Sequence, residues 1–369
     1  GLPKPLLSQS TVDSAMRTDK EAALREYYNI FTNEGGDGQI IKRARIIKNS
    51  YNRIPILKNP DGRREYVFAY DPARSHDNSA LAIGELYEDP TQGLKMKIVN
   101  LVCLQDYFKA NKTPMNTPNQ IKAIKQLLLD YNGDGVADYQ NIKRFLVDAG
   151  SGGAGVPITD FFLEDWEDSD GLMHRGLIDK EYSAEEARNF PNAIPDIVKL
   201  MSPLKYKSEM FESLIQMMDL GLIEFPNEYD GKGFINLIYE IDKNGNRTLR
   251  DYFPSEDEEK ILSKKEITVD TQIHKLTTYE EIALKQIDHA KTELVNIYRF
   301  KQASGKDRFD LDPQKANKMH DDRAYVIAML AWELAQRRRE HITKRKPKKT
   351  DYTQQFINIR PPKFNWKQY

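Results

Sequence analysis

The sequence has few of the features that mark secreted, membrane or nucleotide-hydrolysing proteins. It contains one cysteine in 369 residues, which excludes a disulfide within the chain and suits a reducing compartment. Its longest apolar run, residues 324–332, is too short to span a bilayer. No GxxxxGK[ST] phosphate-binding loop occurs, so we expect no ATP hydrolysis by this chain. The net charge of −1 means that any surface for nucleic acid must come from local clusters of basic residues.

What is present indicates a globular chain, with 39% hydrophobic and 30% charged residues and enough length for one large domain or two ordinary ones. Residues 1–60 do not resemble a compact domain, and we interpret them as a linker from a region further N-terminal. Residues 61–340 are expected to form the main domain, with an α/β insertion at about 230–310. Residues 341–369 are interpreted as a basic C-terminal tail.

Two apolar strands of the main domain each end in an aspartate. Residues 65–70 predict a buried strand that ends at Asp71, because Pro72 cannot continue a ladder. Residues 79–86 and 94–104 predict two further strands, and a helix is expected at 121–131. Residues 142–147 then predict a fourth strand, which ends at Asp148 beside glycines that allow a ligand to approach. Burying such a carboxylate is costly unless a cation pairs with it, although Asp71 could simply cap a turn.

The remaining pattern predicts helices at 156–166, 207–220 and 278–300, short strands at 222–226 and 233–241, and a polar loop at 304–318. The last helix, 324–332, is apolar on all sides and therefore buried. It is preceded by His320, Asp321 and Asp322. Acidic residues suit a helix N-terminus, but adjacent carboxylates opening a buried helix need more explanation than capping. Three strands, helix, strand, helix is the order of a ribonuclease-H-like mixed α/β sheet, in which the ends of the first and fourth strands are neighbours.

The four aspartates predict a metal site. Asp71, Asp148, Asp321 and Asp322 each lie at the terminus of a buried element, and Mg²⁺ or Mn²⁺ prefers hard oxygen ligands. Two such ions can activate water and stabilise the leaving oxygen of a phosphodiester, so no nucleophilic side chain is required. The spacing does not decide which of Asp321 and Asp322 is the direct ligand, and Asp322 is slightly favoured. His320 is a candidate for assisting proton transfer.

Two other features of the sequence could be functional but also have a simpler structural interpretation. The stretch 130–138 begins like a calcium loop, but Asn141 stands where a bidentate glutamate is expected, so a glycine-rich Asx turn is the preferred interpretation. Basic residues near the C-terminus indicate phosphate contact or docking to a partner, with a solvated tail as the alternative. These residues are Arg337, Arg338, Arg339, Lys344, Arg345, Lys346, Lys348 and Lys349.

Taken together, these motifs resemble the nuclease domain of tailed-bacteriophage terminase large subunits. The resemblance lies in Asp71-Pro72-Ala73 followed by Asp77 and 79–81, in 147–153, and in 320–324. The segments 207–226 and Arg25–Tyr28 are also similar to the family, so the resemblance covers roughly residues 20–340. Residues 230–310 are difficult to match to it.

The resemblance implies an endonuclease of the viral DNA-packaging motor, which cuts concatemeric double-stranded DNA with two Mg²⁺ or Mn²⁺ ions. It implies Asp71 as the bridging ligand, Asp148 as the second and Asp322 or Asp321 as the third, with His320 and Asp77 behind them. Implied partners are double-stranded DNA, portal protein, the small terminase subunit and an ATPase domain absent from this chain, and the implied location is the host cytoplasm, at the procapsid, without a membrane. The alternatives are a non-catalytic docking module for portal or DNA, and another ribonuclease-H-like nuclease such as a resolvase.

Overall fold

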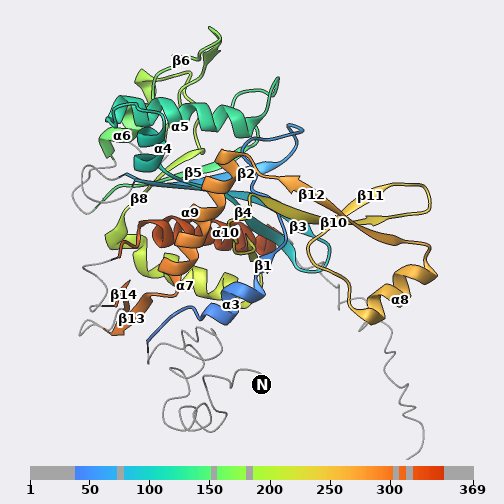
Figure 1. The fold of residues 1–369 in the computed structure, drawn as a ribbon. Helices are drawn as coiled ribbons and strands as arrows, with labels where there is room; N and C mark the ends of the chain where they lie inside the picture. The colour runs from blue at the N-terminus through green and yellow to red at the C-terminus, as the bar shows by residue number, and fades with distance from the viewer. Residues whose placement is uncertain are drawn as a thin grey trace, which may run out of the picture.

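The computed structural model describes residues 38–72, 79–150, 156–179, 186–301, 307–312 and 319–344. A seven-stranded sheet with the order β1-β9-β4-β3-β2-β5-β8 forms its centre (Figure 1). Its strands are β1 (Ser50–Tyr51), β2 (Glu65–Asp71), β3 (Ala80–Asp89), β4 (Gly93–Cys103), β5 (Ile142–Asp148), β8 (Val198–Met201) and β9 (Ile223–Pro226).

The directions of the strands define the fold. β2, β3 and β4 form an antiparallel meander, while β5 and β8 continue the sheet parallel to β2 on its other side. A meander of three strands extended by two parallel strands is the ribonuclease-H-like arrangement, so this prediction is confirmed. The predicted neighbourhood of the first and fourth strands is confirmed too, because Tyr70 of β2 is paired with Val147 of β5.

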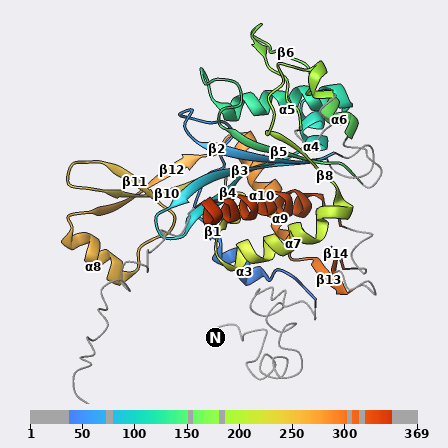
Figure 2. The same cartoon turned by 180° about the vertical axis from the view of Figure 1, so that it is seen from behind.

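Helices cover both faces of the sheet, as Figures 1 and 2 show. One face carries α4 (Leu104–Ala110), α5 (Thr117–Asn132) and α6 (Val156–Asp160). The other carries α7 (Pro203–Asp219), α9 (Thr278–Leu294) and α10 (Asp322–Lys344), with α3 (Arg43–Lys48) beside α7. α10 is buried from residue 324 to 335, because it lies between the sheet and its neighbouring helices.

The alternation of side chains along β2 divides the core into two clusters. Tyr66, Phe68 and Tyr70 point to the face of α5, whereas Val67 and Ala69 point to the face of α10. Successive side chains of a strand point to opposite faces, so one strand supplies both cores. All five side chains are fully buried, which fixes the register of β2 and therefore the face on which each of its residues lies.

The stretch predicted as an insertion, about 230–310, contains a small separate sheet, whereas α9 in the same stretch packs on the main sheet. β10 (Phe234–Ile241), β11 (Arg247–Arg250) and β12 (Thr268–Lys275) make a three-stranded antiparallel sheet that projects from the body together with α8 (Glu256–Lys264) (Figure 1). A tight turn at 242–246 joins β10 to β11, with the Asp242 carboxylate accepting from the backbone of Asn244 and Asn246. Smaller hairpins are β13 (Ile297–Lys301) with β14 (Asp307–Leu311) and β6 (Trp166–Glu167) with β7 (Met173–His174), and η1 (Glu186–Asn189) is a short 3₁₀ turn.

Several predicted boundaries are wrong. The helix predicted at 156–166 ends at Asp160, and the helix predicted at 278–300 ends at Leu294, where Asn296 and then β13 follow. The loop predicted at 304–318 contains β14. Within the stretch interpreted as a linker, α3 and β1 pack on the body, and β1 pairs with β9 in the main sheet. The segment Arg25–Tyr28 lies outside the described residues.

Candidate functional site

The predicted site begins with two aspartates on one face of the sheet. Asp71 follows Val67 and Ala69 at alternate positions of β2, and Asp148 follows Leu146 of β5, so both lie on the face of α10. Because Tyr70 and Val147 are partners in neighbouring parallel strands, the two carboxylates come out of the sheet at the same end. The register of the sheet therefore places them side by side.

The N-terminus of α10 brings the other two aspartates to this pair. The pKa of Asp71 is raised well above its usual range, first by burial and then by the negative charges of Asp148, Asp322 and Asp321, in that order. A charge raises the pKa of a carboxyl only when it lies near. The four aspartates singled out in the sequence are thus one acid cluster, which is the name used below for Asp71, Asp148, Asp321 and Asp322.

Asp148 is the most enclosed member, with 8% of its surface exposed. Its Oδ1 accepts a hydrogen bond from the Gly150 N–H at 3.1 Å and lies 3.4 Å from the donating hydroxyl of Tyr325. Burial raises the pKa of Asp148, and these two hydrogen bonds oppose the rise. Tyr325 comes from the first turn of α10, so the contact also joins the helix to the end of β5.

Lys207 lies at the acid cluster and was not found from the sequence. Its Nζ is 3.9 Å from Asp321 Oδ2 and 5.8 Å from the centre of the Tyr325 ring. Its positive charge lowers the pKa of both Asp71 and Asp148. No local pattern distinguishes this lysine from others on α7, because its role comes from the packing of α7 against α10.

The two aspartates of α10 differ in their surroundings. Asp322 has 14% of its side chain exposed and lies 3.9 Å from His320 Nδ1, whereas Asp321 has 28% exposed and faces Lys207. His320 is half exposed and lies beside Asp322, and its role behind the predicted ligands stays a prediction. Asp77 lies outside the described residues. Asp322 is the more enclosed of the pair and acts more strongly on Asp71 than Asp321 does.

The donor set of the acid cluster suits a hard divalent cation. It offers carboxylate oxygens alone, which Mg²⁺ and Mn²⁺ prefer. Within the described residues no group of three or more His, Cys, Asp or Glu side chains is drawn together as closely as metal ligands are. The same holds for the described loop 130–138, where the Asn132 side chain donates to the Ala137 carbonyl and accepts from the Asn141 N–H.

The basic residues predicted to contact DNA or a partner have mostly intramolecular contacts where they are described. Arg337 pairs with Glu333 at 2.8 Å, and Arg338 donates to the carbonyls of Gln92 and Leu94. Arg339 is 56% exposed and lies 3.2 Å from Glu209. The side chain of Lys344 and all of Arg345, Lys346, Lys348 and Lys349 lie outside the described residues. DNA binding through these residues stays a prediction.

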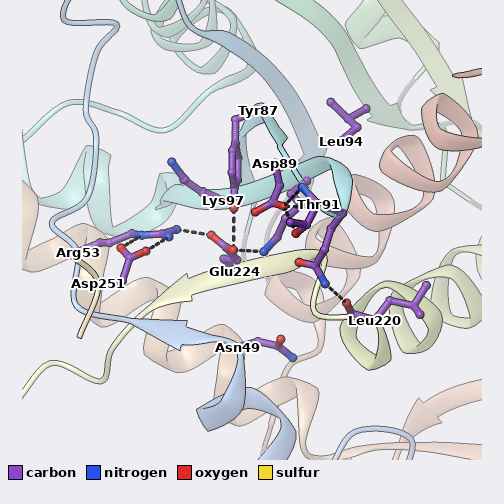
Figure 3. A network of polar contacts seen from close by, with 12 residues as sticks. Asn49, Arg53, Tyr87, Asp89, Thr91, Leu94, Lys97, Leu220, Glu224 and Asp251 are labelled. Atoms are coloured by element: carbon purple, nitrogen blue, oxygen red, sulfur yellow. Dashed lines mark hydrogen bonds and ion pairs between the residues drawn. The ribbon is translucent and has the colours of Figure 1, made fainter. Parts of the chain in front are cut away.

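A second polar network, partly buried, centres on Glu224 and includes Asp251, the residue that follows β11 (Figure 3). Arg53 donates two hydrogen bonds to Asp251, at 2.6 and 2.7 Å, and a third to Glu224 of β9. Glu224 also accepts from Tyr87 and pairs with Lys95. These cations and donors together lower the pKa of Glu224 although burial alone would raise it. Each charge in the network is paired within the chain, so the network joins the projecting sheet to the body.

Comparisons with known proteins give structural relatives only. No protein-family model and no curated protein matches the sequence. The large terminase nuclease from thermophilic phage G20c matches with a TM-score of 0.39 and 14% identity over 80% of this chain and 98% of that one. The same nuclease with bound magnesium matches with a TM-score of 0.39 and 16% identity, over 81% of this chain and 98% of that one. The nuclease domain of the large terminase subunit of bacterial virus Sf6 matches with a TM-score of 0.38 and 10% identity, over 79% of this chain and 97% of that one. The chain is similar, at low identity, to several phage large terminase nuclease domains.

No helix among the described residues is both long enough and apolar enough to cross a bilayer.

Proposed function

We propose that the chain is a divalent-metal-dependent endonuclease that cuts double-stranded DNA as part of a viral DNA-packaging motor. The observation that carries the proposal is the acid cluster itself. Four aspartates, from the ends of two interior strands and the start of one helix, meet at one end of a ribonuclease-H-like sheet, and they come from three distant stretches of the sequence. Gathering like charges is unfavourable unless a cation joins them, so such a cluster is expected at a metal site.

Asp71, Asp148 and Asp322 would hold two Mg²⁺ or Mn²⁺ ions, with Asp321 as the alternative third ligand. When bound, such ions supply a nucleophile from water at neutral pH and stabilise negative charge on the leaving oxygen of a phosphodiester. The chain itself holds the ligands in place. Asp71 and Asp148 are fixed by the sheet, the Tyr325 hydroxyl orients Asp148, and Lys207 balances part of the negative charge.

The proposed substrate and partners follow from the same function. The substrate is concatemeric double-stranded DNA, bound chiefly through its phosphates and therefore with little sequence preference. Proposed partners are portal protein, the small terminase subunit and an ATPase domain outside this chain, in the host cytoplasm at the procapsid.

Cleavage of supercoiled plasmid tests the proposal. The chain is incubated with plasmid in EDTA, Mg²⁺, Mn²⁺ or Ca²⁺, beside Asp71→Asn and the control Asp257→Asn. Asp257 lies on α8 with 91% of its side chain exposed, so it matches the chemical change far from the cluster. We expect cutting with Mg²⁺ or Mn²⁺ by the wild type and the control, and at least a hundredfold loss in Asp71→Asn. Equal cutting by Asp71→Asn, or no cutting by a folded wild type with any ion, would contradict the proposal and favour a docking module.

A further inference from the structure

The first turn of α10 has an unusual cap. The Tyr325 N–H donates to the Asp321 carbonyl at 2.8 Å, which makes Asp321 the N-cap residue and Asp322 the first residue of the helix. An aspartate at the N-cap normally turns its own carboxylate back to the N–H groups of the second and third helical residues, here Arg323 and Ala324. Those donors need a partner, because Ala324 is fully buried.

Glu293 of α9 takes both donors instead. Its Oε2 accepts from the Arg323 N–H at 2.9 Å and from the Ala324 N–H at 3.0 Å. Its Oε1 accepts from the Arg323 guanidinium at 2.7 Å, so both oxygens are used and the buried carboxylate is paired with a cation. Glu293 is 5% exposed and lies on a different helix, 28 residues before Asp321.

A chain of polar contacts holds Glu293 and Arg323 in place. The Arg323 guanidinium also donates to Gln286 Oε1 at 2.8 Å, and the Gln286 amide donates to Asp106 at 2.8 Å. Glu293 and Gln286 lie on the same face of α9, two turns apart, and both are buried. The start of α10 is therefore anchored to α9 through a remote carboxylate, and the N-cap carboxylate is spared from capping.

We propose that Glu293 is a positioning residue, which caps α10 from α9 and thereby leaves the Asp321 carboxylate for the acid cluster. This inference rests on the proposed function of the cluster as a metal site. In the wild type, Asp321 faces Lys207 at 3.9 Å. Without Glu293, the Arg323 and Ala324 N–H groups lose their acceptor, and the carboxylate of the N-cap residue, Asp321, is in the position that ordinarily caps such groups. The cluster then loses one of its negative charges to the helix end.

Titration of the whole chain with Mg²⁺ in a calorimeter tests the inference without requiring turnover. We expect Glu293→Ala to bind Mg²⁺ about tenfold more weakly, the lower end of the effect usual for groups that orient metal ligands. Glu293→Gln keeps an oxygen that can accept from both N–H groups but lacks the charge, so its affinity is expected to stay within about twofold of the wild type. If the charge of Glu293 alone mattered, Glu293→Gln would lose as much affinity as Glu293→Ala.

A double-mutant cycle with Asp321 separates capping from a general structural effect. Asparagine at an N-cap bonds the same N–H groups, and in Asp321→Asn the carboxylate is already absent. Glu293→Ala is therefore expected to cause no further loss of Mg²⁺ affinity in the Asp321→Asn background. Additive losses would overturn the inference. If Glu293→Ala does not fold, the cycle is run with Glu293→Ala/Arg323→Ala, which leaves no buried cation unpaired.

Two control substitutions distinguish a loss of Mg²⁺ affinity from a general loss of stability. Thr277→Ala removes the N-cap of α9, the helix that carries Glu293, and is expected to lower the melting temperature without changing Mg²⁺ affinity. Asp71→Asn is expected to abolish Mg²⁺ binding. A wild type that binds no Mg²⁺ would contradict the proposed function, whereas a wild type that binds Mg²⁺ as tightly as Glu293→Ala does would contradict the positioning role alone.

Discussion

Replacing Asp71 by asparagine is expected to make the metal-free protein more stable at neutral pH. Asp71 is partly buried among the negative charges of Asp148, Asp322 and Asp321, and burial and these charges raise its pKa well above the usual range. Asparagine has nearly the same shape and carries no charge, so the substitution relieves repulsion without leaving a cavity. A trade-off of this kind between stability and function is common at sites built from like charges.

The size of the effect follows from general values. Substitutions that relieve such strain commonly add about 1–2 kcal/mol to the free energy of unfolding. With an unfolding entropy of about 2 cal/mol/K per residue, a chain of this length changes its melting temperature by roughly 1.5 °C for each kcal/mol. Asp71→Asn is therefore expected to melt about 1.5–3 °C above the wild type in EDTA.

The raised pKa of Asp71 determines how the stability difference between the wild type and Asp71→Asn changes with pH. Between the usual carboxyl pKa and the raised pKa of Asp71, the folded state holds a proton that the unfolded state has lost, so wild-type stability falls as pH rises through that range. The advantage of Asp71→Asn should be small below the usual carboxyl pKa, where Asp71 is neutral in both states, and complete above the raised pKa.

Thermal unfolding in EDTA across weakly acid to neutral pH measures this directly, with Asp257→Asn as the control. In saturating Mg²⁺ the wild type should melt at the higher temperature, because ligand binding stabilises only the protein that retains the site. An Asp71→Asn protein that melts below the wild type at neutral pH in EDTA would refute the reasoning, since the carboxylates would then not be repelling one another.

Two further substitutions probe groups that local sequence did not reveal. Lys207→Gln removes the cation beside the acid cluster, so we expect metal-free stability to fall by about 1 kcal/mol and Mg²⁺ affinity to rise a few-fold, measured by thermal unfolding in EDTA and by calorimetry. Unchanged affinity would show that the lysine charge does not act on the site. Arg53→Ala removes one of the two cations paired with the buried Glu224, and also the partner of Asp251, and should cost about 3 kcal/mol in chemical denaturation while Mg²⁺ affinity stays the same. A change in affinity would mean that the two networks are coupled.

The fold and the acid cluster could be predicted because their signals are local and periodic. β2 and β5 are short, almost wholly apolar runs with a carboxylate at the end, and alternation along each strand fixes the face on which Asp71 and Asp148 lie. The apolar start of α10 similarly showed that Asp321 and Asp322 adjoin a buried helix. Order along the chain then sufficed to place the strand ends together.

The errors arose where distant contacts decide the structure. α9 ends at Leu294 because Asn296 turns its amide back to the Thr292 carbonyl at 2.6 Å and its own carbonyl accepts from Asp312 N–H, so the following residues pair with β14. A helical apolar pattern that runs on past Leu294 cannot reveal a partner strand ten residues later. The helix predicted at 156–166 is shorter for a similar reason, because the Phe162 carbonyl accepts from the Leu177 N–H of a later segment at 2.6 Å.

Glu293 shows why the support of a site is harder to predict than its ligands. In the sequence it is one of several charged residues near the C-terminal end of a helix, where a carboxylate is unfavourable beside the helix dipole. It is nevertheless buried, because its partners are the N–H groups and the guanidinium of a second helix about thirty residues later. A buried carboxylate that contradicts the local electrostatics of its own helix must be stabilised from elsewhere, and here that stabilisation comes from the end of α10 that carries Asp321 and Asp322. The ligands follow from the pattern of the chain, whereas the geometry that holds them depends on how α9 and α10 pack.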